Sequence, residues 1–184
     1  MRKIVNLTVL FFLVVFPLMS QKAEPTDRYL LLATKQTSTM EKELDEAARQ
    51  GFRILYGSPT SGTEMVLLLE RVAKPPDTYQ YRLLATNKTS TMEKEMAEAG
   101  GEGFRLMPNT AMAKKSAGLA LTTEVVMIME RPPKAQQRYQ YKLLATTKTS
   151  TMQKEIGEAS AAGFVLIGLI SRGEHMAVME KTLP

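Results

Sequence analysis

The sequence predicts an α+β fold of three tandem βαββ repeats, with small, mostly antiparallel sheets packed into one compact pseudo-threefold body. A block of the form Tyr-x-Leu-Leu-Ala-Thr-x-x-Thr-Ser-Thr-Met begins at Tyr29, Tyr81 and Tyr141. Each block runs on through a helical pattern to Gly-Phe and then to an apolar segment that ends in Glu-Arg or Glu-Lys. Because self-similarity at this spacing marks a repeated structural unit, one small module is expected three times.

The first element of each repeat is predicted to be a strand. In the second copy Tyr79, Tyr81, Leu83 and Ala85 alternate with other residues, which is the period-two pattern of a strand with one buried face. Residues 139–146 repeat this alternation, and residues 27–34 repeat it without the first tyrosine.

A helix follows each strand. The Ser-Thr-Met-Glu or Ser-Thr-Met-Gln segments at Ser38, Ser90 and Ser150 have the spacing of capping boxes, in which serine and the acidic or amide side chain satisfy open amides. A glycine, adopting the left-handed conformation cheaply, is expected to end each helix. These glycines are Gly51, Gly103 and Gly163.

Two further strands complete each unit. The second begins at the Phe after the glycine, and the third covers residues 64–71, 124–131 and 174–181. The second copy carries a hairpin insertion at 108–123, and proline pairs that act as stiff spacers separate the copies. The predicted boundaries are 27–73, 79–131 and 139–182.

The repeats are expected to form one body. Units of this size bury too little surface to be stable alone. In addition, the third strands at 65–69 and 125–129 are apolar on both faces, whereas one helix covers only one face of a sheet.

The first twenty residues are interpreted as a secretory signal peptide, with a basic start at Arg2 and Lys3 and an apolar stretch from Ile4 to Phe16. An uncleaved membrane anchor is the alternative, but the stretch is shorter than the roughly 20 residues of a spanning helix. The prediction is an exported protein of bacterial type, periplasmic or extracellular, without stable membrane insertion after cleavage.

Charge and composition argue against several functional classes. Cleavage would lower Lys plus Arg from 24 to 22 against 19 acids, a net charge of +3, and the lysines are scattered among glutamates rather than gathered in a nucleic-acid footprint. Without cysteine, the chain has no disulfide or thiol chemistry.

No catalytic constellation is evident. His175 is the single histidine and lacks a companion for a metal site or a nucleophilic triad. The acids of the first helix, such as Glu41 and Glu43, have an ordinary structural purpose at a helix start. The sequence therefore predicts a protein that is not an enzyme, with no cofactor and no metal.

Two sites of binding are considered. Lys88, Ser90, Lys148 and Ser150 lie at predicted helix N-termini, where backbone amides favour anions, although capping alone explains the motif. The insertion is apolar and basic and is not required by the repeat, so it is the preferred place for a partner. Its candidate residues are Met112, Lys114, Lys115, Leu119 and Leu121.

The function predicted from these observations is that of a non-enzymatic binding or structural module, with recognition through this hairpin of the second repeat. The alternative is a carrier or receptor for a small apolar or anionic ligand in a groove between repeats, since a methionine-rich surface can adapt to such ligands.

The pattern resembles the small bacterial βαββ domains of unknown function. The shared features are an aromatic first strand, a short helix that ends in Glu102-Gly103-Phe104, and a last strand that closes on a basic residue. The resemblance covers all three copies and implies the fold. It implies no catalytic residue.

Overall fold

The computed structural model describes residues 27–72, 78–116 and 122–184. Within these ranges the protein is a mixed α+β structure with three α-helices and three small antiparallel sheets. The predicted signal peptide lies outside the described residues. No helix in the described part of the chain has the length and apolar character that crossing a bilayer requires.

The first sheet has the strand order β1-β3-β2, so the strand that comes last in the sequence lies in the middle of the sheet. Its elements are β1 (Tyr29–Thr34), α1 (Thr37–Arg49), β2 (Phe52–Pro59) and β3 (Met65–Arg71).

The middle sheet has the order β4-β7-β5, and β6 pairs with β7 beside β5. Its elements are β4 (Gln80–Thr86), α2 (Thr89–Gly101), β5 (Arg105–Leu106), the 3₁₀ turn η1 (Pro108–Thr110), β6 (Met112–Lys115) and β7 (Thr123–Arg131).

The last sheet has the order β8-β10-β9. Its elements are β8 (Arg138–Thr146), α3 (Thr149–Ala161), β9 (Val165–Ser171) and β10 (His175–Leu183).

The helices do not begin with the predicted capping boxes. They begin at Thr37, Thr89 and Thr149, two residues before the expected start, and none of the three has a side-chain bond at its N-cap. The turn into the helix is instead formed by the threonine that ends the preceding strand. The Thr86 hydroxyl oxygen accepts a hydrogen bond from the Lys88 N–H at 3.1 Å, and Thr34 and Thr146 make the same contact.

The helix ends agree with the prediction. Gly51, Gly103 and Gly163 have φ values of 86°, 90° and 87°, a region where a side chain is strained. The Phe104 N–H then returns to the Ala99 carbonyl oxygen at 3.0 Å, so the chain turns directly into its next strand.

The apolar core crosses from one sheet to the next. One buried cluster joins Leu44 and Ile54 of the first segment to Tyr81 and Ile128 of the middle segment. A second cluster joins residues of the middle segment, such as Met96, to residues of the last segment, such as Tyr141 and Val178. Because the clusters are shared, the sheets are parts of one packed body.

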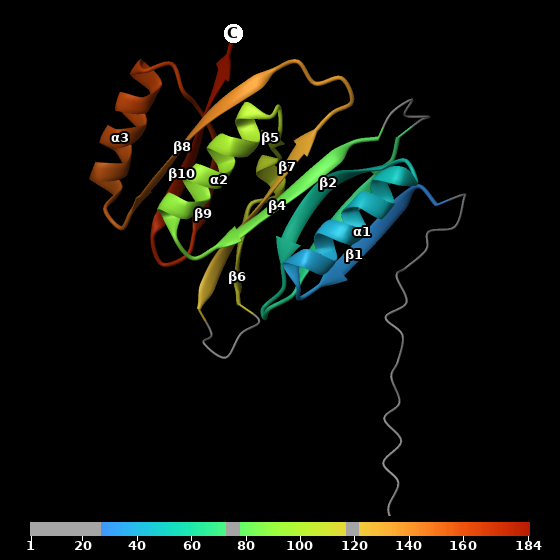
Figure 1. The fold of residues 1–184 in the computed structure, drawn as a ribbon. Helices are drawn as coiled ribbons and strands as arrows, with labels where there is room; N and C mark the ends of the chain where they lie inside the picture. The colour runs from blue at the N-terminus through green and yellow to red at the C-terminus, as the bar shows by residue number, and fades with distance from the viewer. Residues whose placement is uncertain (1–26, 73–77, 117–121) are drawn as a thin grey trace, which may run out of the picture.

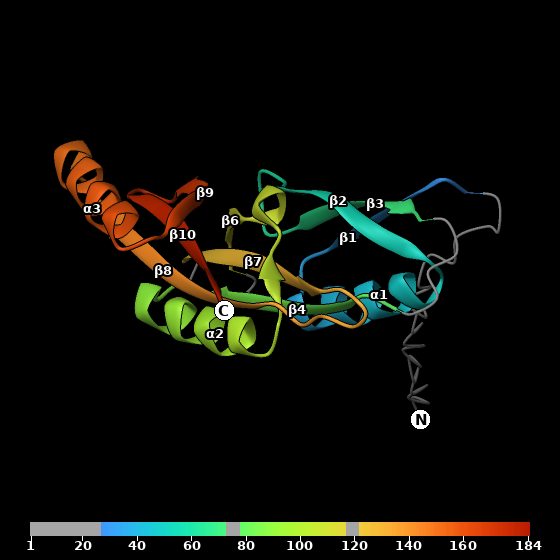
Figure 2. The same cartoon turned by 90° about the horizontal axis from the view of Figure 1, so that it is seen from above.

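The sheets follow one another in a row (Figures 1 and 2). Helix α1 packs on β4, the first strand of the middle sheet, and α2 packs on β8, the first strand of the last sheet. Figure 1 shows the resulting alternation of α3, β8, α2, β4, α1 and β1 across the molecule. This row differs from the predicted pseudo-threefold body, because α1 and α2 each pack on the first strand of the following sheet, whereas α3 packs on its own sheet.

Candidate functional site

A groove of about 380 Å³ in the described part of the chain is lined by residues of all three sheets. Its polar lining includes Arg53 of β2, Arg105 of β5, Asn109 of η1, Glu130 of β7 and Glu180 of β10. The register that places the two glutamates is the same in all sheets. Glu70, Glu130 and Glu180 lie opposite Tyr29, Tyr81 and Tyr141.

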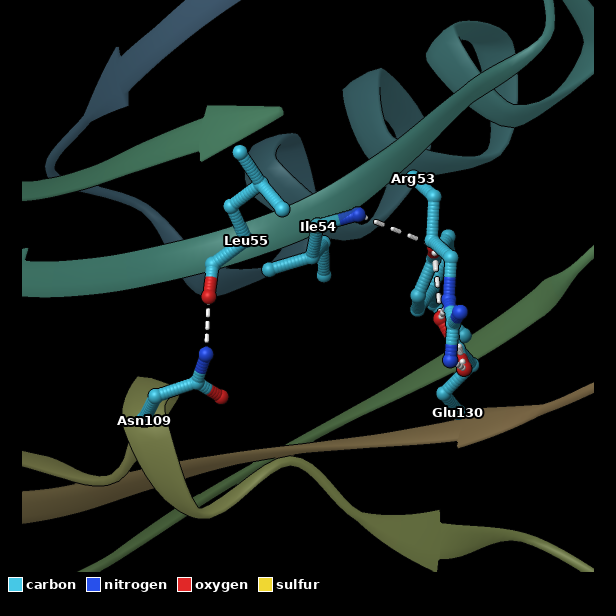
Figure 3. A network of polar contacts seen from close by, with 6 residues as sticks. Arg53, Ile54, Leu55, Asn109 and Glu130 are labelled. Atoms are coloured by element: carbon cyan, nitrogen blue, oxygen red, sulfur yellow. Dashed lines mark hydrogen bonds and ion pairs between the residues drawn. The ribbon is translucent and has the colours of Figure 1, made fainter. Parts of the chain in front are cut away.

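The first junction, between the first and middle sheets, is built on Glu130 (Figure 3). Arg53 donates to this carboxylate from Nε at 2.9 Å and from Nη2 at 2.7 Å. The Tyr81 hydroxyl also donates to Glu130, at 3.1 Å, and accepts a hydrogen bond from the Ile54 N–H at 3.3 Å. Nearby, the Asn109 amide donates to the Leu55 carbonyl oxygen.

The second junction, between the middle and last sheets, repeats this arrangement with Glu180. Arg105 donates to Glu180 from Nε at 3.0 Å, and its Nη2 lies 2.9 Å from the same carboxylate. The Tyr141 hydroxyl donates to Glu180 at 3.0 Å and accepts from the Leu106 N–H at 2.9 Å. Both junctions therefore use the same four groups, namely arginine and a backbone N–H from one sheet and tyrosine and glutamate from the next.

Both carboxylates are deeply buried while their arginines are partly exposed. The side chains of Glu130 and Glu180 are each 5% exposed, against 43% for Arg53 and 57% for Arg105. The hydrogen bonds to Glu130 raise the pKa of the Arg53 guanidinium, and those to Glu180 raise the pKa of Arg105. The guanidinium groups also stack over Tyr79 and Tyr139, at 4.8 and 5.4 Å from the ring centres.

Burial raises the pKa of the Tyr81 and Tyr141 hydroxyls above the ordinary value, and the adjacent glutamates raise it further. The stability that this shift contributes is fully present below the ordinary tyrosine pKa of about 10 and falls as the pH rises beyond it. We expect the free energy of unfolding to decrease more steeply above about pH 10 than in a Tyr81→Phe, Tyr141→Phe double variant. Urea titrations across this range measure both slopes, and equal slopes would contradict the shift.

The acids that the sequence places in capping boxes also join neighbouring sheets. Glu41 of α1 accepts a hydrogen bond from the Leu83 N–H of β4 at 3.3 Å, and Glu93 of α2 accepts one from the Leu143 N–H of β8 at 3.2 Å. The capping-box prediction is therefore wrong for Glu41 and Glu93. These side chains bind a backbone N–H of the next sheet rather than one at the start of their own helix.

Substitutions at Ser90 and Glu93 distinguish capping of the helix from the contact with the next sheet. Ser90→Ala should change the free energy of unfolding by less than about 0.5 kcal/mol, because this exposed serine caps nothing. Glu93→Ala should cost about 0.5–1.5 kcal/mol by removing the acceptor of the Leu143 N–H. Glu93→Gln keeps an oxygen there and serves as the control. A larger loss of unfolding free energy for Ser90→Ala than for Glu93→Ala would support the capping box instead.

Two residues predicted to bind a partner through the insertion are buried. Met112 is 3% exposed and lies in the core cluster shared with the first sheet. The Lys114 side chain is 1% exposed and forms an ion pair with Glu124 at 2.5 Å. Both side chains are buried in β6 and are not accessible to a partner. Lys115 is exposed, so partner binding stays a prediction for this described residue. Leu119 and Leu121 lie outside the described residues.

The predicted anion-site residues are exposed but divided between two helices. Lys88 and Ser90 lie at the start of α2, and Lys148 and Ser150 lie at the start of α3. His175, the first residue of β10, is also exposed. The described residues contain no group of three His, Cys, Asp or Glu side chains suited to a metal ion.

The junction residues were not predicted from the sequence. A signal was nevertheless present, because Arg53 and Arg105 each follow the Phe that begins the second strand, and Glu70, Glu130 and Glu180 each precede the final basic residue. The repeated charge pattern could have suggested an ion pair, although not that the pair joins two copies.

Comparisons with protein-family models, with curated proteins and with solved structures find no match to this chain.

Proposed function

We propose that the protein is an exported, non-enzymatic structural or binding module made of three tandem βαββ repeats that stack in a row. The observation that carries this proposal is the recurrence of one Arg–Glu–Tyr–amide contact at both junctions. The N-terminal pattern of residues 1–20 supports export.

The bonding at the junctions favours a structural role over acid–base chemistry. Each glutamate already accepts hydrogen bonds from an arginine and a tyrosine, and each tyrosine hydroxyl already accepts one from a backbone N–H. Because satisfied polar groups in a buried network fix geometry, these contacts hold neighbouring sheets in one orientation. A stacked array of this kind offers a long, rigid surface for binding.

Double-mutant cycles test this proposal. One cycle combines Arg53→Met with Glu130→Gln, and the other combines Arg105→Met with Glu180→Gln. We expect both pairs to show favourable coupling of about 0.5–3 kcal/mol in the free energy of unfolding, because each pair is in direct contact. Coupling near zero at both junctions would remove the basis for a structural role.

A carrier for a small anionic or apolar ligand is the second candidate, and the groove supports it. The exposed parts of Arg53 and Arg105 lie beside Met107, Pro108 and Ile167 in its lining. This combination suits a ligand with an acidic head and an apolar body.

Fluorescence of anilinonaphthalene sulfonate, an apolar anion, tests the carrier. Ile167→Glu, which adds a negative charge in the groove, should weaken binding of this probe at least tenfold if the groove is the site. Leu31→Glu is the control, because it adds the same charge at an exposed position of β1 outside the groove. Equal loss in both variants, or binding unaffected by either, would count against the carrier.

A further inference from the structure

The two ends of the row expose residues that are buried at both internal junctions. On β1, Tyr29 is 48% exposed, whereas its counterparts Tyr81 and Tyr141 are 6% and 4% exposed. On β9, Leu166 is 45% exposed, whereas Ile54 and Leu106 at the same place after the Phe are 2% and 3% exposed. We call Arg28, Tyr29, Leu31 and Glu70 the β1 face, and Gln153, Val165, Leu166 and Leu169 the β9 face.

The β1 face carries the same groups through which the middle and last sheets contact the sheet before them. Tyr29 lies opposite Glu70 in the same register as the tyrosine–glutamate pairs of the two junctions. Leu31 occupies the place of Leu83 and Leu143, whose N–H groups bind a carboxylate from the preceding helix. The N–H of Leu31 consequently points to the open edge of β1.

The β9 face has the groups with which the first and middle sheets contact the next one. The Leu166 N–H stands where the Ile54 and Leu106 N–H groups bind a tyrosine hydroxyl. Gln153 of α3 is exposed and stands in the place of Glu41 and Glu93, with an amide oxygen that can accept the same backbone hydrogen bond.

The two departures from the junction pattern compensate each other. Val165 replaces the arginine on the β9 face, so this face brings no cation to a glutamate. The β1 face supplies its own, because Arg28 donates to Glu70 from Nε at 3.0 Å and from Nη2 at 2.9 Å. A contact between the two faces would therefore leave no unpaired charge, and the apolar Val165 would lie beside an already neutralised carboxylate.

We propose that the β9 face of one molecule docks on the β1 face of a second copy of this chain and forms a third junction of the same kind. In this contact Tyr29 donates to Glu70 and accepts from Leu166 of the second molecule, while Gln153 accepts from the Leu31 N–H. Figure 1 shows α3 at one side of the molecule and β1 at the other, with the middle sheet between them.

This contact is heterologous, because the two faces are different. Each molecule that docks leaves one β1 face and one β9 face open, so successive additions extend a chain or close a ring. The inference rests on the stacking proposed above and adds that stacking continues between molecules.

Two charge-introducing variants test the polarity of the contact in the full chain. Leu31→Lys blocks the β1 face and Leu166→Lys blocks the β9 face. Both positions are about half exposed, so the fold should be kept, which thermal unfolding checks. Tyr56→Lys is the control, because this tyrosine is 62% exposed and belongs to neither face.

Sedimentation equilibrium gives the association state. We expect the unmodified protein and the Tyr56→Lys variant to gain mass with concentration, and each face variant alone to be monomeric. An equimolar mixture of Leu31→Lys and Leu166→Lys should form a two-chain complex, because one intact β9 face meets one intact β1 face.

Other outcomes would overturn the inference. The unmodified protein could be monomeric at every concentration, as it would be if another part of the chain or a different protein covers these faces. Alternatively, one face variant could dimerise alone, which would mean that like faces pair. Either result, obtained with favourable coupling in both internal double-mutant cycles, would reject the docking of the β9 face on the β1 face while leaving the structural proposal intact.

Discussion

Gly100→Ala should lower the free energy of unfolding by about 1–3 kcal/mol. Gly100 lies where α2 packs on β8, and a Cβ atom there would be 2.4 Å from the Tyr139 carbonyl oxygen and 2.9 Å from the Tyr141 ring. Because the oxygen belongs to the backbone of a paired strand, the helix and the last sheet must separate to admit the methyl group. Chemical denaturation of the full chain measures the loss.

Gly101→Ala is the matched control, since the next residue of the same helix has nothing within 4 Å of its Cβ position. Alanine is a better helix former than glycine, so this variant should be neutral or more stable by up to about 1 kcal/mol. If both variants lose stability equally, the close approach of α2 to β8 is not the cause.

Tyr141→Phe should cost about 1–3 kcal/mol, because it removes one hydroxyl that serves two buried groups. The Leu106 N–H loses its acceptor and the Glu180 carboxylate loses a donor, although Arg105 still pairs with Glu180. The ring is kept, so packing is unchanged and the loss reports the hydrogen bonds. Thermal unfolding at neutral pH measures it.

Tyr139→Phe makes the same chemical change two residues earlier in β8. The Tyr139 ring contributes its face to Arg105, and phenylalanine keeps that face. Its effect should be smaller than about 0.5 kcal/mol. A loss as large as that of Tyr141→Phe would show that the bridging hydroxyl carries no special contribution.

Local structure was largely predictable from the sequence. The alternation that starts at Tyr79 predicts β4, and the glycine before Phe104 predicts the end of α2, because both signals lie in a few neighbouring residues. The α+β class and antiparallel sheets follow from these elements. The helix starts were wrong by two residues, since the hydroxyl of Thr86 forms the turn before Ser90 can cap.

Long-range arrangement was less predictable. A repeated Glu at the end of each copy indicates a common role, but the sequence does not reveal whether Glu130 meets an arginine of its own copy or of the preceding one. Burial of Met112 and Lys114 was also missed, because their apolar and basic pattern also suits an exposed binding loop. Membership in the small bacterial βαββ group stays a prediction.

Differential scanning calorimetry of the full chain tests most directly whether the two junctions join the three sheets into one unit. We predict one transition whose calorimetric and van't Hoff enthalpies agree, because the core clusters and the Glu130 and Glu180 contacts cross both junctions. Gly100→Ala should move this transition to lower temperature without dividing it. Two or more resolved transitions in the unmodified protein would contradict the account.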